Sequence, residues 1–151
     1  MGRSKLYIHY GATEFSPERF EPIKNRMSYN KPTGGLWASA LSSKYGWKQW
    51  CRRNDFDSCN LKKSFRFKLN TKRIFVIDSC EKAHTLPRRK KDPFEIGIEL
   101  TYPVLPDFEL LAKEYDAIDF RISSDSALYF EMYTWDCDSI LVLNQDVIEV
   151  V

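Results

Sequence analysis

The segment KPTGGLWAS, residues 31–39, joins a turn signal to a short apolar strand. Gly34 and Gly35 come directly before Leu36 and Trp37, and glycine permits positive φ angles and a close approach of other groups to the backbone. Trp37 offers a large flat face for stacking and one N–H donor. Taken alone, the segment favours a Pro-Gly turn that leads into a strand with its Trp in the core. The alternative is that Trp37 forms one wall of a site for a planar ligand ring, and support for this alternative has to come from the flanking residues.

Length and composition predict one domain. The chain has 151 residues, of which 43% are hydrophobic and 15% aromatic, enough for a hydrophobic core. No apolar run approaches the roughly 20 residues of a membrane-spanning helix, and no secretory signal precedes the first strand. We therefore expect a single domain over residues 1–151, monomeric, cytoplasmic and without a membrane partner. The four cysteines show no CxxC spacing and there are two histidines, so we expect reduced thiols and no metal site.

Charge is distributed unevenly along the chain. Residues 44–91 hold 15 Lys or Arg and 4 Asp or Glu, a net charge of +11, whereas residues 92–151 hold 2 and 14, a net charge of −12. The basic segment is suited to an anion such as a dinucleotide pyrophosphate or a nucleic acid. The alternative is that the two segments neutralise each other across one folded domain.

The residue pattern alternates strands with helices at first and then gives mostly strands, which favours an α+β fold. Ser16-Pro17-Glu18 is typical of a helix start, and Phe65, Phe67 and Leu69 alternate as in a half-buried strand. The pattern predicts strands at 5–11, 35–39, 64–69, 73–78, 94–100, 117–122, 127–133 and 139–144, helices at 17–28, 45–54 and 106–115, and a tight turn at 70–72.

Three segments occur in an order that resembles the ADP-ribosyltransferase family: HYGAT (9–13), GGLWAS (34–39) and DSILVLN (138–144). In that family an early strand ends in a His-Gly or Arg-Gly pair that holds NAD. A second strand carries an aromatic residue that stacks on nicotinamide, and a Glu at the start of a later strand binds the nicotinamide ribose. The resemblance implies a mostly antiparallel, split β-sheet core with flanking helices, and NAD as the substrate.

The resemblance also implies site residues. Trp37 stands where the family has Tyr, and the His of the first motif is one position early if Gly11 marks the pair. The residues implied for binding NAD are His9, Tyr10, Gly11, Gly35, Leu36, Trp37 and Ser39.

The resemblance places Asp138 where the family has its catalytic Glu, and Asp136 at the first position of the Glu-x-Glu pattern of arginine-directed members. A carboxylate beside the ribose stabilises the positive charge that develops when the nicotinamide bond breaks. Asp is one methylene shorter than Glu, and Glu131 is a reserve candidate. On the residues alone, 136–138 is equally an acidic hairpin turn, and His9 equally a core residue.

These features lead to two hypotheses. The first is an NAD-dependent ADP-ribosyltransferase, or an NAD glycohydrolase, that acts on a macromolecular acceptor. The second is a non-enzymatic binding module with a basic face for a nucleic acid or a protein partner.

Overall fold

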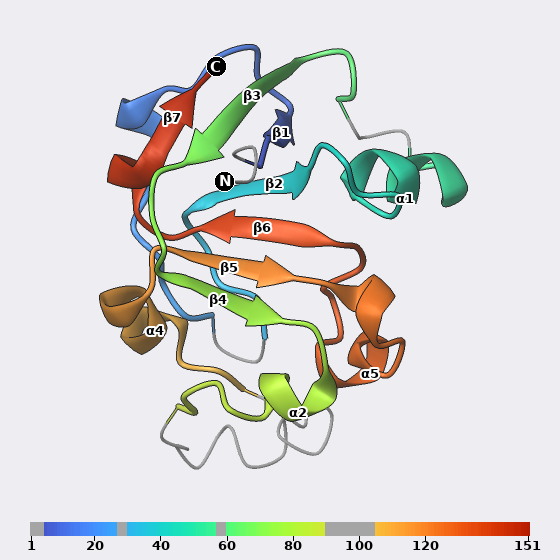
Figure 1. Ribbon diagram of the computed structural model, residues 1–151, viewed down its shortest axis with the longest axis vertical. Coiled ribbons are helices and arrows are strands. Elements are labelled where there is room, and N and C mark those ends of the chain that lie inside the picture. Colours follow the sequence, from blue (N-terminus) through green and yellow to red (C-terminus); the bar gives the residue numbers. More distant parts are fainter. Residues whose placement is uncertain (1–4, 27–29, 57–59, 90–104) are drawn as a thin grey trace.

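A seven-stranded sheet forms the centre of the molecule in the computed structural model, which describes residues 5–26, 30–56, 60–89 and 105–151 (Figure 1). The strand order is β4-β5-β6-β2-β1-β3-β7. The strands are β1 (Tyr7–Tyr10), β2 (Leu36–Ala40), β3 (Ser64–Leu69), β4 (Ile74–Ile77), β5 (Ala117–Phe120), β6 (Ser139–Val142) and β7 (Ile148–Val150).

Every neighbouring pair of strands is antiparallel except β4 and β5, which run parallel. The sheet is therefore mixed, and with the helices around it the fold is α+β.

The sheet opens between its central strand β2 and the neighbouring strand β1. β1 pairs with β2 only at Tyr7↔Ala40 and Ile8↔Ser39, whereas β1 pairs with β3 along its whole length, from Tyr7 to Tyr10. Beyond Ile8, β1 therefore follows β3 and separates from β2. This opening leaves room for a cavity at the level of Trp37.

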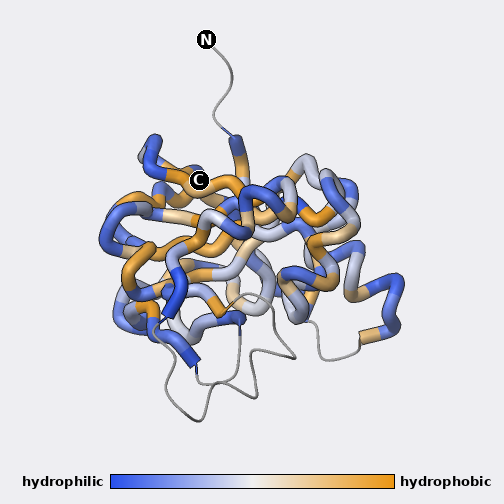
Figure 2. Tube along the Cα trace, turned by 90° about the horizontal axis from the view of Figure 1, so that it is seen from below, coloured by the Kyte–Doolittle hydropathy of each residue, from blue (hydrophilic) through white to orange (hydrophobic). Residues whose placement is uncertain are grey.

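Two hydrophobic clusters stabilise the sheet, one on each face. Strand alternation sends Ile118 and Leu141 into one cluster and Ala117 and Ile140 into the other. The first cluster includes the fully buried Trp135. Figure 2 shows the hydrophobic stretches running through the middle of the molecule and the hydrophilic ones along its outer turns.

The helices lie around the sheet (Figure 1). In α4 (Phe108–Glu114) the Asp107 side chain caps the Leu110 N–H, and Ser79 caps α2 (Cys80–Ala83) in the same way. The other helices in the described residues are α1 (Trp47–Arg53) and α5 (Leu128–Glu131), with 3-10 turns at Pro17–Arg19, Ile122–Ser124 and Gln145–Val147.

Two predicted elements are wrong. In the described part of the helix predicted at 17–28, residues 17–26, only a 3-10 turn forms, Pro17–Arg19, because the chain then turns to pair Lys24 with Thr33 in an isolated bridge. Residues 127–133, predicted as a strand, contain the short helix α5 instead. The Asp125 side chain accepts from the Ala127 N–H and the Asp125 carbonyl accepts from the Leu128 N–H, so a helical turn starts here.

The connection from β3 to β4 is not a hairpin either. The two strands lie in opposite halves of the sheet, because Thr71 bonds to Asp116 beside β5 and Asn70 to the Val147 carbonyl beside β7. Strand β7 was not predicted, and the strand predicted at 94–100 lies outside the described residues.

The glycine pair before β2 has a packing role. Gly34 has φ +83°, and a Cβ there would lie 2.2 Å from the Pro22 carbonyl oxygen. Gly35 has φ +70°, and a Cβ there would lie 2.6 Å from the Val142 carbonyl oxygen. Both positions require glycine because the backbone of 21–22 and of β6 passes directly against them.

Two further findings bear on the predictions from composition. Cys51 is disulfide-bonded, so the expectation of reduced thiols is wrong for this residue. Among the described residues no helix is long and apolar enough to cross a membrane.

Candidate functional site

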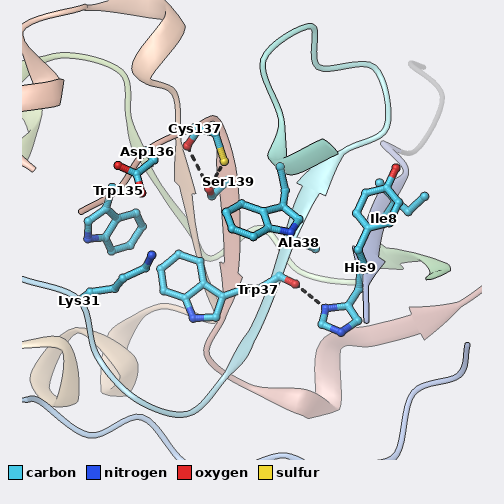
Figure 3. A pocket seen from close by; sticks show the side chains of 11 residues that line it. Ile8, His9, Lys31, Trp37, Ala38, Trp135, Asp136, Cys137 and Ser139 are labelled. Atoms are coloured by element: carbon cyan, nitrogen blue, oxygen red, sulfur yellow. Dashed lines mark hydrogen bonds between the residues drawn. The ribbon is translucent and has the colours of Figure 1, made fainter. Parts of the chain in front are cut away.

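A cavity of about 220 Å³ lies where β1 and β2 separate (Figure 3). Its wall comes from the ends of β1 and β2, the start of α1 and the segment that leads into β6. The lining residues are Ile8, His9, Tyr10, Lys31, Trp37, Ala38, Trp47, Trp135, Asp136, Cys137 and Ser139.

His9 bridges the opening in the sheet. Its Nδ1 lies 2.6 Å from the Trp37 carbonyl oxygen, a contact that fixes Nδ1 as the hydrogen-bond donor because the carbonyl can only accept. The ring also packs on Phe65, with ring centroids 5.2 Å apart. Contacts to β2 and β3 therefore hold His9 in place, and within the described residues its Nε2 makes no hydrogen bond.

Two indoles and an amine form the inner wall. Trp37 meets Trp135 edge-on, with ring centroids 4.9 Å apart, and the Trp135 N–H donates to the Asn30 carbonyl oxygen. The Lys31 ammonium lies 4.8 Å from the Trp37 ring centroid and donates to the Thr134 carbonyl oxygen. Figure 3 shows this ammonium between the two indoles, directed toward Asp136. Burial lowers the pKa of Lys31, while Asp136 opposes that shift.

Asp136 is the carboxylate of this cavity. Burial raises its pKa, and the Lys31 charge opposes the rise. Within the described part of the chain, its carboxylate oxygens accept no hydrogen bond and form no ion pair within 4.0 Å. This is unusual, because a partly buried carboxylate normally accepts hydrogen bonds from nearby donors. The oxygens of Asp136 are thus available to accept hydrogen bonds from a ligand.

Asp138 has a different environment. Its carboxylate accepts from Ser43 Oγ at 3.2 Å, from the Ser123 N–H at 3.0 Å and from Ser123 Oγ at 2.6 Å, and it lines a separate polar cavity with Lys5 and Arg121. Asp136 and Asp138 therefore line different cavities, whereas the Glu-x-Glu pattern implied one shared site. Alternation holds only within a strand, and both residues precede β6, which starts at Ser139.

The other predicted site residues do not line the first cavity. Gly35 and Leu36 line a third cavity, on the opposite face of the sheet, which shares His9 with the first. Ser39 is 3% exposed, accepts from the Trp47 N–H and donates to the Asp138 carbonyl oxygen, so it holds the start of α1. Gly11 is exposed with φ +114° and donates to the Lys63 carbonyl oxygen.

The structure thus brings His9, Tyr10, Trp37 and Asp136 together in one cavity. Sequence reasoning did not assign Lys31, Trp47, Trp135 or Cys137 to it. Lys31 is the first residue of the segment 31–39, and Trp135 directly precedes the acidic segment 136–138, so their positions beside the predicted site residues were the available signal. The reserve candidate Glu131 instead contacts His84, with 3.0 Å between Oε2 and Nε2.

The Cys137 thiol is unsuited to nucleophilic chemistry at neutral pH. Burial raises its pKa to about 11, although Ser139 and Lys31 favour the thiolate, and the thiolate is the reactive form. Within the described residues, no group of three or more His, Cys, Asp or Glu side chains is placed to hold a metal ion. The cavity therefore offers an aromatic surface, one ammonium and one carboxylate with unused acceptors.

Comparisons with models of known protein families, with curated proteins and with solved structures find no match to this chain.

Proposed function

We propose that the protein binds the nicotinamide riboside half of NAD in the cavity between β1 and β2 and cleaves the nicotinamide–ribose bond. The products are free nicotinamide and ADP-ribose, and the ADP-ribose is transferred to a macromolecular acceptor or to water. The observation that carries the proposal is Asp136, a partly buried carboxylate with no hydrogen bond from the described residues, opposite Trp37 and Lys31.

The size and lining of the cavity suit a ring and its sugar. At about 220 Å³ it is smaller than the roughly 300–1,000 Å³ of pockets that enclose a whole drug-sized ligand. The half-buried indole of Trp37 offers an apolar face to a planar ring, and the fully buried Trp135 packs behind it. The rest of a dinucleotide would extend past His9, which also borders the third cavity with Arg19.

Asp136 has the chemistry that this reaction needs. When the glycosidic bond breaks, its electron pair leaves with nicotinamide, and the ribose carbon takes on oxocarbenium character. An ionised carboxylate lowers the energy of that charge and accepts a hydrogen bond from a ribose hydroxyl. Lys31 supports the ionised form of Asp136, because its charge lowers the pKa that burial raises.

The test uses NAD labelled on the adenine side, incubated with the protein and a cell lysate. We expect free nicotinamide and label attached to macromolecules, or labelled free ADP-ribose if water is the acceptor. As a control, the Lys113→Gln variant changes an exposed residue of α4 that does not line the cavity, and it should behave as wild type. If NAD stays intact under all conditions, the non-enzymatic binding module becomes the better hypothesis.

A further inference from the structure

The rim of the cavity continues into an aromatic surface on α1. Trp47, which lines the cavity, stacks on Trp50 with ring centroids 5.2 Å apart and ring planes 9° apart. Phe56 meets Trp50 edge-on at 5.5 Å and is 45% exposed. Neither indole belongs to the two hydrophobic clusters of the sheet. The three rings therefore form an aromatic step that runs from the cavity toward solvent.

Exposed basic side chains on α1 and β3 lie near Tyr10, at the cavity end of this step. Arg52 and Arg53 are exposed in the last turn of α1. Arg66 is exposed on β3, opposite Ile8 in the register, so it faces the same side of the sheet as Tyr10. Arg52 and Arg66 both lie close enough to Tyr10 to oppose the rise that burial causes in the pKa of its hydroxyl.

The basic residues reach the end of β1 as well. Gly11 donates to the Lys63 carbonyl oxygen at 2.9 Å, and Lys62 and Lys63 are exposed there. In the described part of the chain none of these lysines, nor Arg52 or Arg66, lies within 4.0 Å of a carboxylate. In the sequence, Asp55 follows Arg52 by three residues and Asp57 precedes Lys62 by five. The surface therefore keeps a positive charge beside the aromatic step.

We propose that this surface, made of Trp47, Trp50, Phe56, Arg52, Arg66 and Lys63, binds single-stranded nucleic acid and brings one of its nucleotides to the cavity. Bases stack on exposed aromatic rings irrespective of sequence, and cations track the phosphates. A duplex hides the faces of its bases, so only the phosphate contacts would remain for it. The role of the bound strand as acceptor rests on the proposed function, whereas binding itself does not require NAD.

Transfer to such an acceptor balances without a further reagent. A ring or exocyclic atom of the base attacks the ribose carbon, and the bond to nicotinamide breaks with its electron pair on nicotinamide. The proton of the attacking group passes to solvent. Ordinary NAD is the only co-substrate.

Binding is measured by fluorescence anisotropy without NAD, using labelled 12-nucleotide oligo-dT and oligo-U and a duplex of the same length. We expect both single strands to bind more tightly than the duplex, and comparing them shows whether DNA or RNA is preferred. Neutralising about three phosphates, one for each of Arg52, Arg66 and Lys63, predicts a slope of log K against log salt near −2. Trp50→Ala should weaken binding roughly 5- to 150-fold, as loss of one stacked base does.

Matched variants keep the test independent of folding. Arg52→Gln with Arg66→Gln changes exposed side chains only and should reduce the salt slope by about 1.4. Lys24→Gln with Lys113→Gln makes the same change of charge on exposed residues elsewhere and should leave binding unchanged. Phe130→Ala removes an aromatic side chain that is 74% exposed on α5 and should also have no effect.

Three outcomes would overturn the proposal: no binding of either single strand, equal binding of duplex and single strand, or equal weakening by both pairs of charge variants. If labelled NAD modifies only protein in a lysate and neither oligonucleotide binds, the surface is a protein-binding one. If the oligonucleotides bind as expected and NAD stays intact, the binding surface stands and the proposed reaction fails.

Discussion

Asp136 and Asp138 are two residues apart, yet neutralising them should have opposite effects on stability. Asp138→Asn removes the charge from an acceptor of three hydrogen bonds, with distances of 3.2, 3.0 and 2.6 Å. A hydrogen bond to a charged group contributes about 1.5–3 kcal/mol. Because Asn keeps one oxygen acceptor, we expect a loss of about 2–3 kcal/mol, or roughly 4–12 °C in melting temperature for a chain of this length.

Asp136→Asn removes a charge that the fold disfavours. Burial raises the pKa of Asp136, so the folded protein holds this proton more tightly than the unfolded chain does. Ionisation at neutral pH therefore lowers stability, and the Asn variant should melt at or above the wild-type temperature. The gain should shrink as the pH falls toward the pKa of Asp136 and vanish below the unfolded value near 3.8.

The assay is thermal unfolding followed by circular dichroism at pH 7.5 and 5, for wild type and both variants. Equal destabilisation by Asp136→Asn and Asp138→Asn would contradict the contrast drawn between the two carboxylates. A rise in melting temperature for Asp138→Asn would show that its three hydrogen bonds do not stabilise the fold.

Three further predictions concern the cavity and the sheet. Lys31→Met should move the acidic limb of the pH–rate profile to higher pH, because Lys31 lowers the pKa of Asp136; an unchanged limb would exclude this coupling. Gly34→Ala should destabilise the fold by more than the ~1–2 kcal/mol of a positive φ alone, since its Cβ would lie 2.2 Å from a carbonyl oxygen. Gly11→Ala, where the nearest atom would be 3.9 Å away, should show only the φ effect in denaturant unfolding. Burial would raise the pKa of Asp116, but hydrogen bonds from Thr71 and Asn144 and the charge of Arg73 hold it below its usual value; the stability lost in Asp116→Asn at pH 7 should therefore disappear as the pH falls below about 3.8, and a pH-independent difference would refute this.

The sequence predicted the regular strands well because their signals are local. Alternation in 64–69 and the apolar run in 139–144 match β3 and β6, and Asp107 caps α4 near the predicted position. The failures occur where distant contacts decide. In the described residues, the helix predicted at 17–28 does not continue beyond Arg19, because Lys24 pairs with Thr33, and Ile23 still reaches the core.

The candidate site was predicted in part for the same reason. His9 and Trp37 lie on strands whose motifs could be located in the sequence, and both line the cavity. The choice between Asp136 and Asp138 depends on where β6 begins and on Ser43 and Ser123, which no local pattern predicts. Trp135 enters the cavity because Asn30, 105 positions earlier, accepts its N–H.

The most direct test of the account is the rate of nicotinamide release from NAD by wild type, Asp136→Asn and Asp138→Asn, measured below the melting temperature of each. Loss of a preorganised electrostatic contact typically lowers a rate about 100- to 1,000-fold, and we predict a fall of this size for Asp136→Asn with NAD binding retained. Asp138→Asn should keep most of the activity of the folded protein. Undiminished release by Asp136→Asn, or a larger loss in Asp138→Asn, would contradict the assignment of Asp136 as the carboxylate beside the ribose.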